Sequence, residues 1–259
     1  MTKDCRTYEL TNFNSSTNTN VLPSAVIVNR QRATNKRMSK VEIFENERAT
    51  GYNQFVETWI PNYNYFLDRL PKLLSETAKK DLLVVGCGTG NEIERFVQAP
   101  EHWKITGIDP SPETIKQASA KLQTYDNVTL IEGLLTNLDI ERKYSAATLL
   151  LVLHFLDDNG NKLNLLKDIA DRLVSGATFV LLDITGDKNK IRQNLKVLKL
   201  LLPDGLDEGQ ISQRLKRIET ELFPVSEERL SELCREAGFD APLRFFQSSI
   251  YMGWLTKKK

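Results

Sequence analysis

From residue 80 onward, short apolar runs of strand length alternate with segments in which apolar side chains recur every three or four residues. The first pattern is typical of strands and the second of amphipathic helices. Because several strand runs are apolar at every position, we expect a parallel sheet covered on both faces. The predicted strands are 82–85, 103–108, 128–131, 146–153 and 177–184, and the predicted helices are 92–98, 112–122 and one that begins after Asp157 or Asp158.

The last third of the chain breaks this alternation. Residues 188–221 predict two helices around a turn, and a further helix runs from Ser226 to Gly238. Residues 244–255 predict one or two closing strands. The whole pattern predicts a doubly wound, Rossmann-like α/β fold: a mostly parallel, seven-stranded sheet with helices on both faces and an N-terminal helical cap.

The first 80 residues fall into two parts. Residues 11–20 are nearly all Asn, Ser and Thr, so they cannot bury enough apolar surface to offset the entropy lost on ordering. We therefore predict that residues 1–40 form a disordered basic tail. Residues 41–80 have helical apolar spacing, which predicts the cap. The main domain is then 81–259, with residues 188–221 as a helical insertion.

Composition narrows the function classes. The 259 residues carry a net charge of +1, but residues 41–256 carry −7, because the first 40 residues contribute +5 and the three terminal lysines +3. This negative net charge argues against a nucleic-acid-binding surface, because such surfaces need clustered Lys and Arg. It favours a neutral or cationic small ligand. The cysteines have neither disulfide nor zinc spacing, and no metal-ligand cluster is present. Without an apolar run of about 18 residues or a compact signal region, we expect a cytoplasmic protein with no membrane span.

A glycine-rich loop follows the first predicted strand. The segment Gly86-Cys87-Gly88-Thr89-Gly90 leads from that strand into a helix. Glycines at such a turn let the backbone approach a ligand closely, although loops of this kind also occur as plain turns. The spacing is G-x-G-x-G, since Asn91 stands where the dinucleotide fingerprint needs its third glycine.

Asp109 ends the second predicted strand, 19 residues after Gly90. An acid at this place can accept hydrogen bonds from two ribose hydroxyls. The alternative is that Asp109 serves an Asp-Pro turn or caps the next helix. The order of elements favours a site for a ribose-bearing ligand, because strand, loop, helix and second strand lead directly to this acid.

These segments resemble the class I S-adenosylmethionine-dependent methyltransferases. VVGCGTG is similar to their first motif and GIDPSPE to their second, while VTLIEG, AATLLLVLHFLDD and LVSGATFVLLD are similar to their third, fourth and fifth strands. The resemblance covers about 80–256. Within that superfamily, IPNYNYFLDRL and FFQSSIYMGWL look similar to the carboxy-S-adenosylmethionine synthase group and its methyltransferase relatives.

The resemblance implies S-adenosyl-L-methionine as cofactor. A Pro-x-Tyr segment contacts the cofactor in the synthase group, which implies a contact for Tyr63. Leu134 stands where the family has an acid for the adenine, so adenine recognition would rest on backbone groups and apolar packing. Leu150 lies on the fourth strand, which commonly ends in a polar residue. The implied cofactor-binding residues are Tyr63, Gly86, Cys87, Gly88, Asp109, Pro110, Leu134 and Leu150.

The helical insertion bears on which cofactor is used. The synthases carry an arginine there for the extra carboxylate of their product. The alignment places residues 200–203 at that point, and they contain no arginine. This departure favours ordinary S-adenosylmethionine and a methyl product. The basic face of residues 188–202 is interpreted as a lid over the acceptor, a surface helix or the contact of a homodimer.

Methyl transfer needs mainly alignment and exclusion of water, and a base only where the acceptor loses a proton. His154 is the candidate base, because it follows the fourth strand at the edge where ligands bind in open α/β sheets; a structural role is the alternative. Tyr63 is either part of an aromatic wall for the sulfonium or part of the core. The sequence predicts a methyltransferase with a small-molecule acceptor. The alternatives are an enzyme of tRNA wobble-uridine modification and a non-catalytic cofactor-binding relative.

Overall fold

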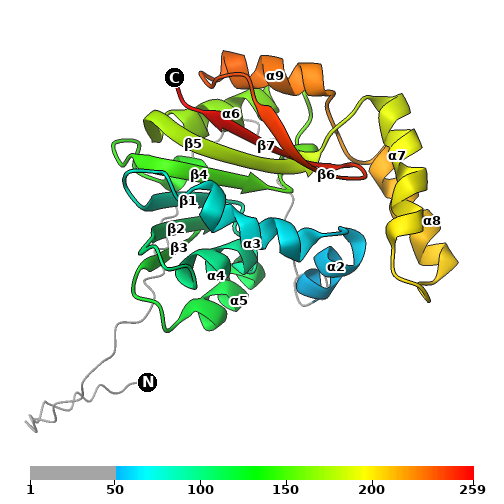
Figure 1. Ribbon diagram of the computed structural model, residues 1–259, viewed down its shortest axis with the longest axis horizontal. Helices are drawn as coiled ribbons and strands as arrows, with labels where there is room; N and C mark the ends of the chain where they lie inside the picture. Colours follow the sequence, from blue (N-terminus) through cyan, green and yellow to red (C-terminus); the bar gives the residue numbers. More distant parts are fainter. Residues whose placement is uncertain (1–50) are drawn as a thin grey trace, which may run out of the picture.

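The computed structural model describes residues 51–259, so the predictions for the tail and for the first ten residues of the cap lie outside the described part. Seven strands form one sheet in the order β3-β2-β1-β4-β5-β7-β6 (Figure 1). Strands β1 to β5 pair in parallel, and β7 runs antiparallel to both β5 and β6. The strands are β1 (Asp81–Val85), β2 (Lys104–Asp109), β3 (Val128–Glu132), β4 (Tyr144–Leu150), β5 (Leu173–Ile184), β6 (Leu243–Ser248) and β7 (Tyr251–Lys257). The predicted fold class is confirmed.

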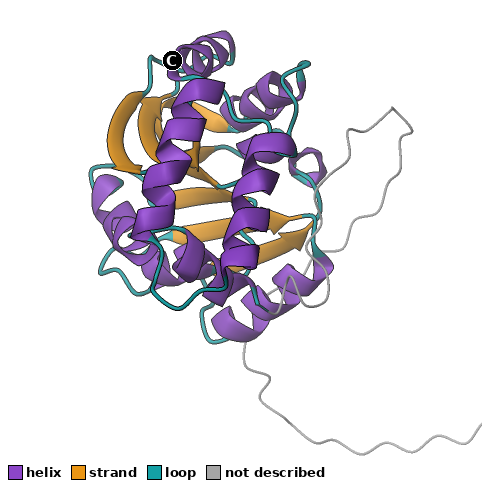
Figure 2. Cartoon of the chain, turned by 90° about the vertical axis from the view of Figure 1, so that its right-hand side faces the viewer, coloured by secondary structure: helices purple, strands orange, loops and turns teal. Residues whose placement is uncertain are grey.

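Helices cover both faces of this sheet (Figure 1). Helices α3, α4 and α5 pack on one face, and α6 and α9 pack on the other. Helices α7 and α8 contact each other and lie side by side in front of the sheet in Figure 2. The helices are α2 (Tyr52–Trp59), α3 (Tyr63–Leu73), α4 (Asn91–Val97), α5 (Pro112–Leu122), α6 (Asn161–Ala170), α7 (Lys188–Leu201), α8 (Glu208–Thr220) and α9 (Glu227–Glu236), with short 3-10 turns η1 (Leu135–Asn137) and η2 (Leu153–Phe155).

The central strands are buried on both sides. In β1, Leu82 and Val84 belong to the core under α3 and α4, whereas Leu83 and Val85 belong to the core under α6 and α9. Successive side chains of a strand point to opposite faces, so a strand covered twice must be apolar throughout. This requirement explains the uninterrupted apolar runs of the sequence.

Some element boundaries differ from the predicted ones. The fourth strand ends at Leu150 and not at residue 153, because Leu151 has a positive φ of 60° that breaks the extended conformation. Gly160 is the cap residue of α6 in place of Asp157 or Asp158. Asp158 instead pairs with Arg229 of α9, at 2.8 Å from Nε.

Three further predictions concern the closing strands, a membrane span and the division into domains. The closing segment forms two strands, since Ser249 with a φ of 57° turns the chain between β6 and β7. Within residues 51–259, no helix is long and apolar enough to cross a membrane. The division of the chain into cap, main domain and insertion stays a prediction.

Candidate cofactor and acceptor site

A cavity of about 610 Å³ lies at the carboxyl ends of the parallel strands. Its walls come from the glycine loop, from the segments that follow β2, β3 and β4, and from helices α2 and α8. Most of the side chains that line it are apolar. Size, lining and position match those of small-molecule sites in doubly wound folds.

The glycine loop is shaped by a close approach of the chain after β4. Gly86 has a φ of 71°, and a Cβ added to it would lie 2.4 Å from Cγ2 of Val152. Only glycine fits there without a shift of the backbone. Further along the loop, the Gly88 amide donates to Oδ2 of Asp109 over 2.9 Å. The loop and the end of β2 are therefore fixed relative to each other.

Asp109 contacts the start of the next helix and also lines the cavity, so both roles that its sequence position leaves open remain compatible with the fold. Its Oδ1 accepts from the amide of Ser111 at 2.9 Å and from the hydroxyl of Thr114 at 3.1 Å, which steadies the start of α5. The side chain also lines the cavity and is 8% exposed. Burial raises its pKa, and hydrogen bonds from the amides of Ser111 and Gly88 work against the rise. The side chain of Ser111 hydrogen-bonds to the carboxylate as well, so four protein groups contact it.

The predicted cofactor-binding residues divide into two groups. Tyr63 and Cys87 are buried and do not belong to the cavity wall. Cys87 instead packs against Gly107 of β2, where an added Cβ would meet its Sγ at 3.1 Å. Roles for Tyr63 and Cys87 in binding stay predictions. The predicted residues that do line the cavity are Gly86, Gly88, Asp109, Pro110, Leu134 and Leu150, together with the candidate base His154.

The backbone of Leu134 is occupied by a local turn. Its amide donates to Oδ1 of Asn137 over 2.8 Å, and its carbonyl accepts from the Asn137 amide over 2.8 Å. At this residue the amide is therefore not free to recognise an adenine, and the side chain is what Leu134 offers to the cavity. The backbone contact with adenine that the resemblance implies is therefore blocked at this residue by the local turn.

His154 sits in the turn η2 that follows β4, and it is 5% exposed. Its Nδ1 lies 2.9 Å from Oδ1 of Asp183, at the end of β5. The same carboxylate accepts from the amides of Leu153 and Ile184, both over 2.8 Å. A carboxylate held in this way fixes Nδ1 as the protonated nitrogen, so we assign Nε2 as the basic one. The sequence pattern did not single out Asp183, although an acidic residue at the end of an apolar strand can indicate a functional site.

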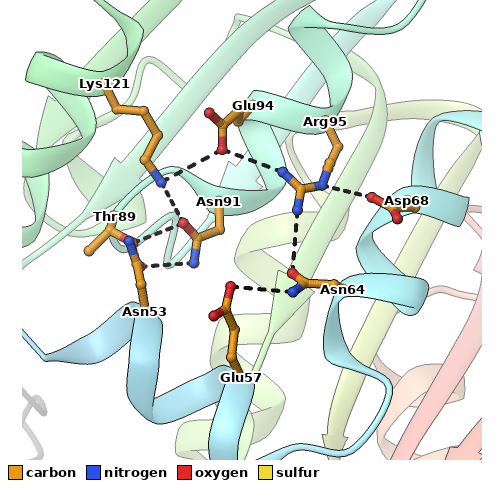
Figure 3. Close-up of polar contacts among 9 residues, drawn as sticks. All are labelled: Asn53, Glu57, Asn64, Asp68, Thr89, Asn91, Glu94, Arg95 and Lys121. Atoms are coloured by element: carbon orange, nitrogen blue, oxygen red, sulfur yellow. Dashed lines mark hydrogen bonds and ion pairs between the residues drawn. The ribbon is translucent and has the colours of Figure 1, made fainter.

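Helix α2 lies within residues 41–80, whose helices the sequence predicts as part of the roof of the cleft, but the sequence does not indicate which of its residues face the cavity. Its Tyr52, Phe55 and Val56 line the cavity. Asn53 of the same helix accepts at Oδ1 from the Thr89 hydroxyl over 2.6 Å and from Nδ2 of Asn91 over 2.9 Å (Figure 3). The polar face of α2 is thereby joined to the glycine loop. Apolar spacing alone cannot show which cavity a helix faces.

Comparisons with known proteins agree with this geometry. A magnesium protoporphyrin IX methyltransferase of Synechocystis superposes with a TM-score of 0.58 at 17% identity, over 81% of this chain and 95% of that chain. A candidate O-methyltransferase of Nostoc punctiforme gives a TM-score of 0.60 at 13% identity; the match covers 82% of this chain but only 61% of that chain. At these identities the likeness shows the fold.

Sequence relatives add the family. A family model described as a methyltransferase domain matches residues 83–179. The carboxy-S-adenosyl-L-methionine synthase 1 of Yersinia pseudotuberculosis is 24% identical over 225 residues, which are 83% of this chain and 92% of that protein. The carboxy-S-adenosyl-L-methionine synthase of Helicobacter pylori is 25% identical over 79% of this chain and 89% of its own length. The family model and these relatives support a class I S-adenosylmethionine-dependent methyltransferase that is similar to the carboxy-S-adenosyl-L-methionine synthase group.

Two arginines at the cavity were not indicated by the alignment. Residues 200–203, which the alignment placed at the position of the synthase arginine, contain none, whereas Arg214 and Arg217 of α8 both line the cavity. The Arg214 guanidinium lies 4.5 Å from the centre of the Phe55 ring. The alignment pointed to residues 200–203, at the end of α7, whereas the cavity is reached by the following helix. A helical repeat based on the buried Ile211 and Ile218 could have placed these arginines near the packed face of α8.

Proposed function

We propose that this methyltransferase moves the methyl group of S-adenosylmethionine to a small-molecule acceptor whose proton is taken by His154. The cofactor supplies an already activated methyl group on a sulfonium. One observation carries the proposal: Asp109, the glycine loop and His154 line a single apolar cavity, and Asp183 holds Nδ1 of His154 from behind that wall. Within residues 51–259 no group of three or more His, Cys, Asp or Glu side chains could hold a metal ion.

The residues of the cavity fit this cofactor. The carboxylate of Asp109 lines the cavity at the place suited to a ribose hydroxyl, and the backbone of Gly86 and Gly88 forms part of the same wall. The apolar side chains of Leu134 and Leu150 suit contact with an adenine. Such contacts position the methyl group for in-line displacement, and the apolar walls limit the access of water.

His154 supplies the proton-accepting function in this proposal. Asp183 holds Nδ1, so the imidazole keeps one orientation and one tautomer while its ring lines the cavity. A positioned base of this kind contributes roughly 100-fold or more where a hydroxyl or amine must lose its proton. The cavity volume and the net negative charge of residues 41–256 support a small acceptor over a nucleic acid. A homodimer contact stays a prediction.

A second function is favoured by one specific observation. Arg214 and Arg217 place positive charge at a cavity that would hold a cationic cofactor, and the sequence relatives are named carboxy-S-adenosyl-L-methionine synthases. In that alternative an arginine balances a carboxylate carried by the cofactor. Mass spectrometry of the ligand that copurifies with the protein separates the two: an unmodified cofactor or its demethylated product supports methyl transfer, and a carboxylated cofactor supports the synthase alternative.

The direct experiment is a transfer assay with methyl-labelled S-adenosylmethionine and metabolite extracts. We expect label in a small molecule, with turnover reduced roughly 100-fold or more in His154→Gln. His102→Gln is the matched control, because His102 is exposed. Unchanged turnover in His154→Gln would remove the base from the proposal. Label in RNA would contradict the small acceptor, and cofactor binding without any transfer would support the non-catalytic alternative.

A further inference from the structure

A buried lysine lies directly beneath the turn that carries His154. Lys162 of α6 is 1% exposed, although lysine is among the residues least often found fully buried. Its ammonium donates to the carbonyl of Leu153 over 2.6 Å. That carbonyl belongs to the residue before His154, so the lysine contacts the backbone of η2 itself. The proposed function gives this contact no role.

Lys162 and the histidine–aspartate pair share one pocket. Lys162, His154 and Asp183 line it together, with apolar neighbours from β5 and α9. The negative charges that face the ammonium come from Asp183 and from Asp157 and Asp158 in the loop after η2. Burial lowers the pKa of Lys162 to about 8, and these three carboxylates work against the fall. The ammonium therefore carries its charge near neutral pH.

Asp158 is already engaged elsewhere. Arg229 of α9 binds its carboxylate through Nε at 2.8 Å and through Nη2 at 3.2 Å. Asp157 accepts from the side-chain amides of Asn159 and Asn161. Asp183, by contrast, contacts Nδ1 of His154 and lines the same pocket as Lys162. The charge of Lys162 is thus opposed by the carboxylate that orients the proposed base.

We propose that Lys162 is a positioning residue: its ammonium fixes the turn of His154, and its charge opposes the pull of Asp183 on the imidazolium form of the ring. The role in catalysis rests on the proposed function. The electrostatic reason is simple, because a carboxylate beside an imidazole favours the imidazolium and a nearby cation disfavours it. Without the lysine, Asp183 would still orient His154, but no nearby cation would oppose its preference for the imidazolium form.

Two neutral substitutions separate the charge from the hydrogen bond. Lys162→Met removes both, whereas Lys162→Gln removes the charge and keeps an N–H that can donate to the Leu153 carbonyl. Lys162→Arg keeps the charge and should restore the wild-type behaviour. Lys167→Met is the matched control, since Lys167 is an exposed lysine on the same helix. If Lys162→Met does not fold, Lys162→Gln still carries the test.

The readout is the NMR titration of the imidazole. The sequence has two histidines, so the background His102→Gln leaves His154 alone in the spectrum. We expect the protonation midpoint of His154 to move up by about one pH unit in Lys162→Met and Lys162→Gln. Lys162→Arg and Lys167→Met should leave the midpoint in place. The acid limb of kcat against pH should move by the same amount and in the same direction.

An unchanged midpoint in both neutral variants would overturn the inference, and so would an equal shift in Lys167→Met. The NMR result does not depend on knowing the acceptor. If the midpoint moves as expected while His154→Gln keeps full turnover, then the coupling of Lys162 to His154 stands and the proposed base is wrong.

Discussion

At the scale of single residues, the two readings of Asp109 turn out to be compatible. The sequence spacing left open whether this acid binds a ligand or stabilises a helix start. The carboxylate contacts Ser111 and Thr114 of the helix start and also lines the cavity. Spacing predicts where such an acid lies, but the number of its acceptor positions already in use depends on atoms that only the fold brings together.

We expect Asp109→Ala to weaken the binding of S-adenosylmethionine at least tenfold, because one charge-assisted hydrogen bond contributes about 1.5 kcal/mol or more. The melting temperature should also fall, since the amides of Gly88 and Ser111 lose their acceptor. Calorimetric titration and thermal denaturation measure the two effects. Asp126→Ala, at an exposed acid, is the control. Equal affinity in Asp109→Ala would refute the ribose assignment.

Glu92 gives a stability prediction with a defined pH range. This buried acid accepts at Oε1 from the Thr148 hydroxyl over 2.5 Å, and burial raises its pKa from 4.5 to about 8. The folded state therefore binds the proton more tightly than the unfolded state does. The resulting stabilisation is complete below about pH 4.5 and is lost as the pH rises through about 8.

We expect Glu92→Gln to raise the melting temperature relative to wild type at about pH 9 and to change it little at about pH 5. The amide keeps an oxygen for the Thr148 hydroxyl and cannot ionise. Glu94→Gln, on the same helix and half-buried, is the control. A wild-type protein and a Glu92→Gln variant with the same dependence of melting temperature on pH would contradict the assignment.

At the scale of elements, the sequence predicted the strands and helices better than it predicted the contacts between them. The helix over 112–122 has the predicted boundaries, since Pro112 suits a first turn and Ser111 a cap position. The segment after β4 was harder, because the positive φ of Leu151 reflects packing and has no local sign in an apolar run.

Helix α2 and helix α8 show what sequence patterns leave out. Both were expected as helices, but neither the contact of Asn53 with the glycine loop nor the place of Arg214 in the cavity wall was expected. Asn53 contacts a loop some 36 residues later, and Arg214 lies over the ring of Phe55 from the other end of the chain. Contacts between such distant segments depend on how the sheet and helices assemble. Helical periodicity within one segment does not predict them.

The contact between α2 and the glycine loop leads to a prediction at this scale. Asn53 uses Oδ1 as acceptor for both Thr89 and Asn91. We expect Asn53→Ala to weaken cofactor binding about tenfold, because α2 loses its polar anchor. Asn53→Asp should retain most of the affinity, since a carboxylate oxygen can accept both bonds. Calorimetry with each variant measures the effect.

The control for this element is Asn64→Ala. Asn64 belongs to the same surface network through Glu57 and Arg95, but it does not contact the loop (Figure 3). If Asn64→Ala and Asn53→Ala weaken binding equally, the effect is general loosening of α2 and α3. If Asn53→Asp is as weak as Asn53→Ala, the acceptor role of Oδ1 is wrong.

At the scale of the whole molecule, net charge and local charge point in different directions. Residues 41–256 carry −7, which led to the expectation of a neutral or cationic ligand. The cavity nevertheless contains Arg214 and Arg217 next to apolar walls. Long-range steering depends on the summed charge, whereas recognition depends on the few groups that contact the ligand. The acceptor is thus better inferred from the cavity than from the net charge.

The central claim is that the cavity at the carboxyl edge of the sheet binds S-adenosylmethionine. Calorimetric titration of the purified protein with S-adenosylmethionine and with its demethylated product tests it most directly. The account predicts saturable binding of both at one site per chain, weakened at least tenfold in Asp109→Ala. If neither compound binds, the central claim is contradicted.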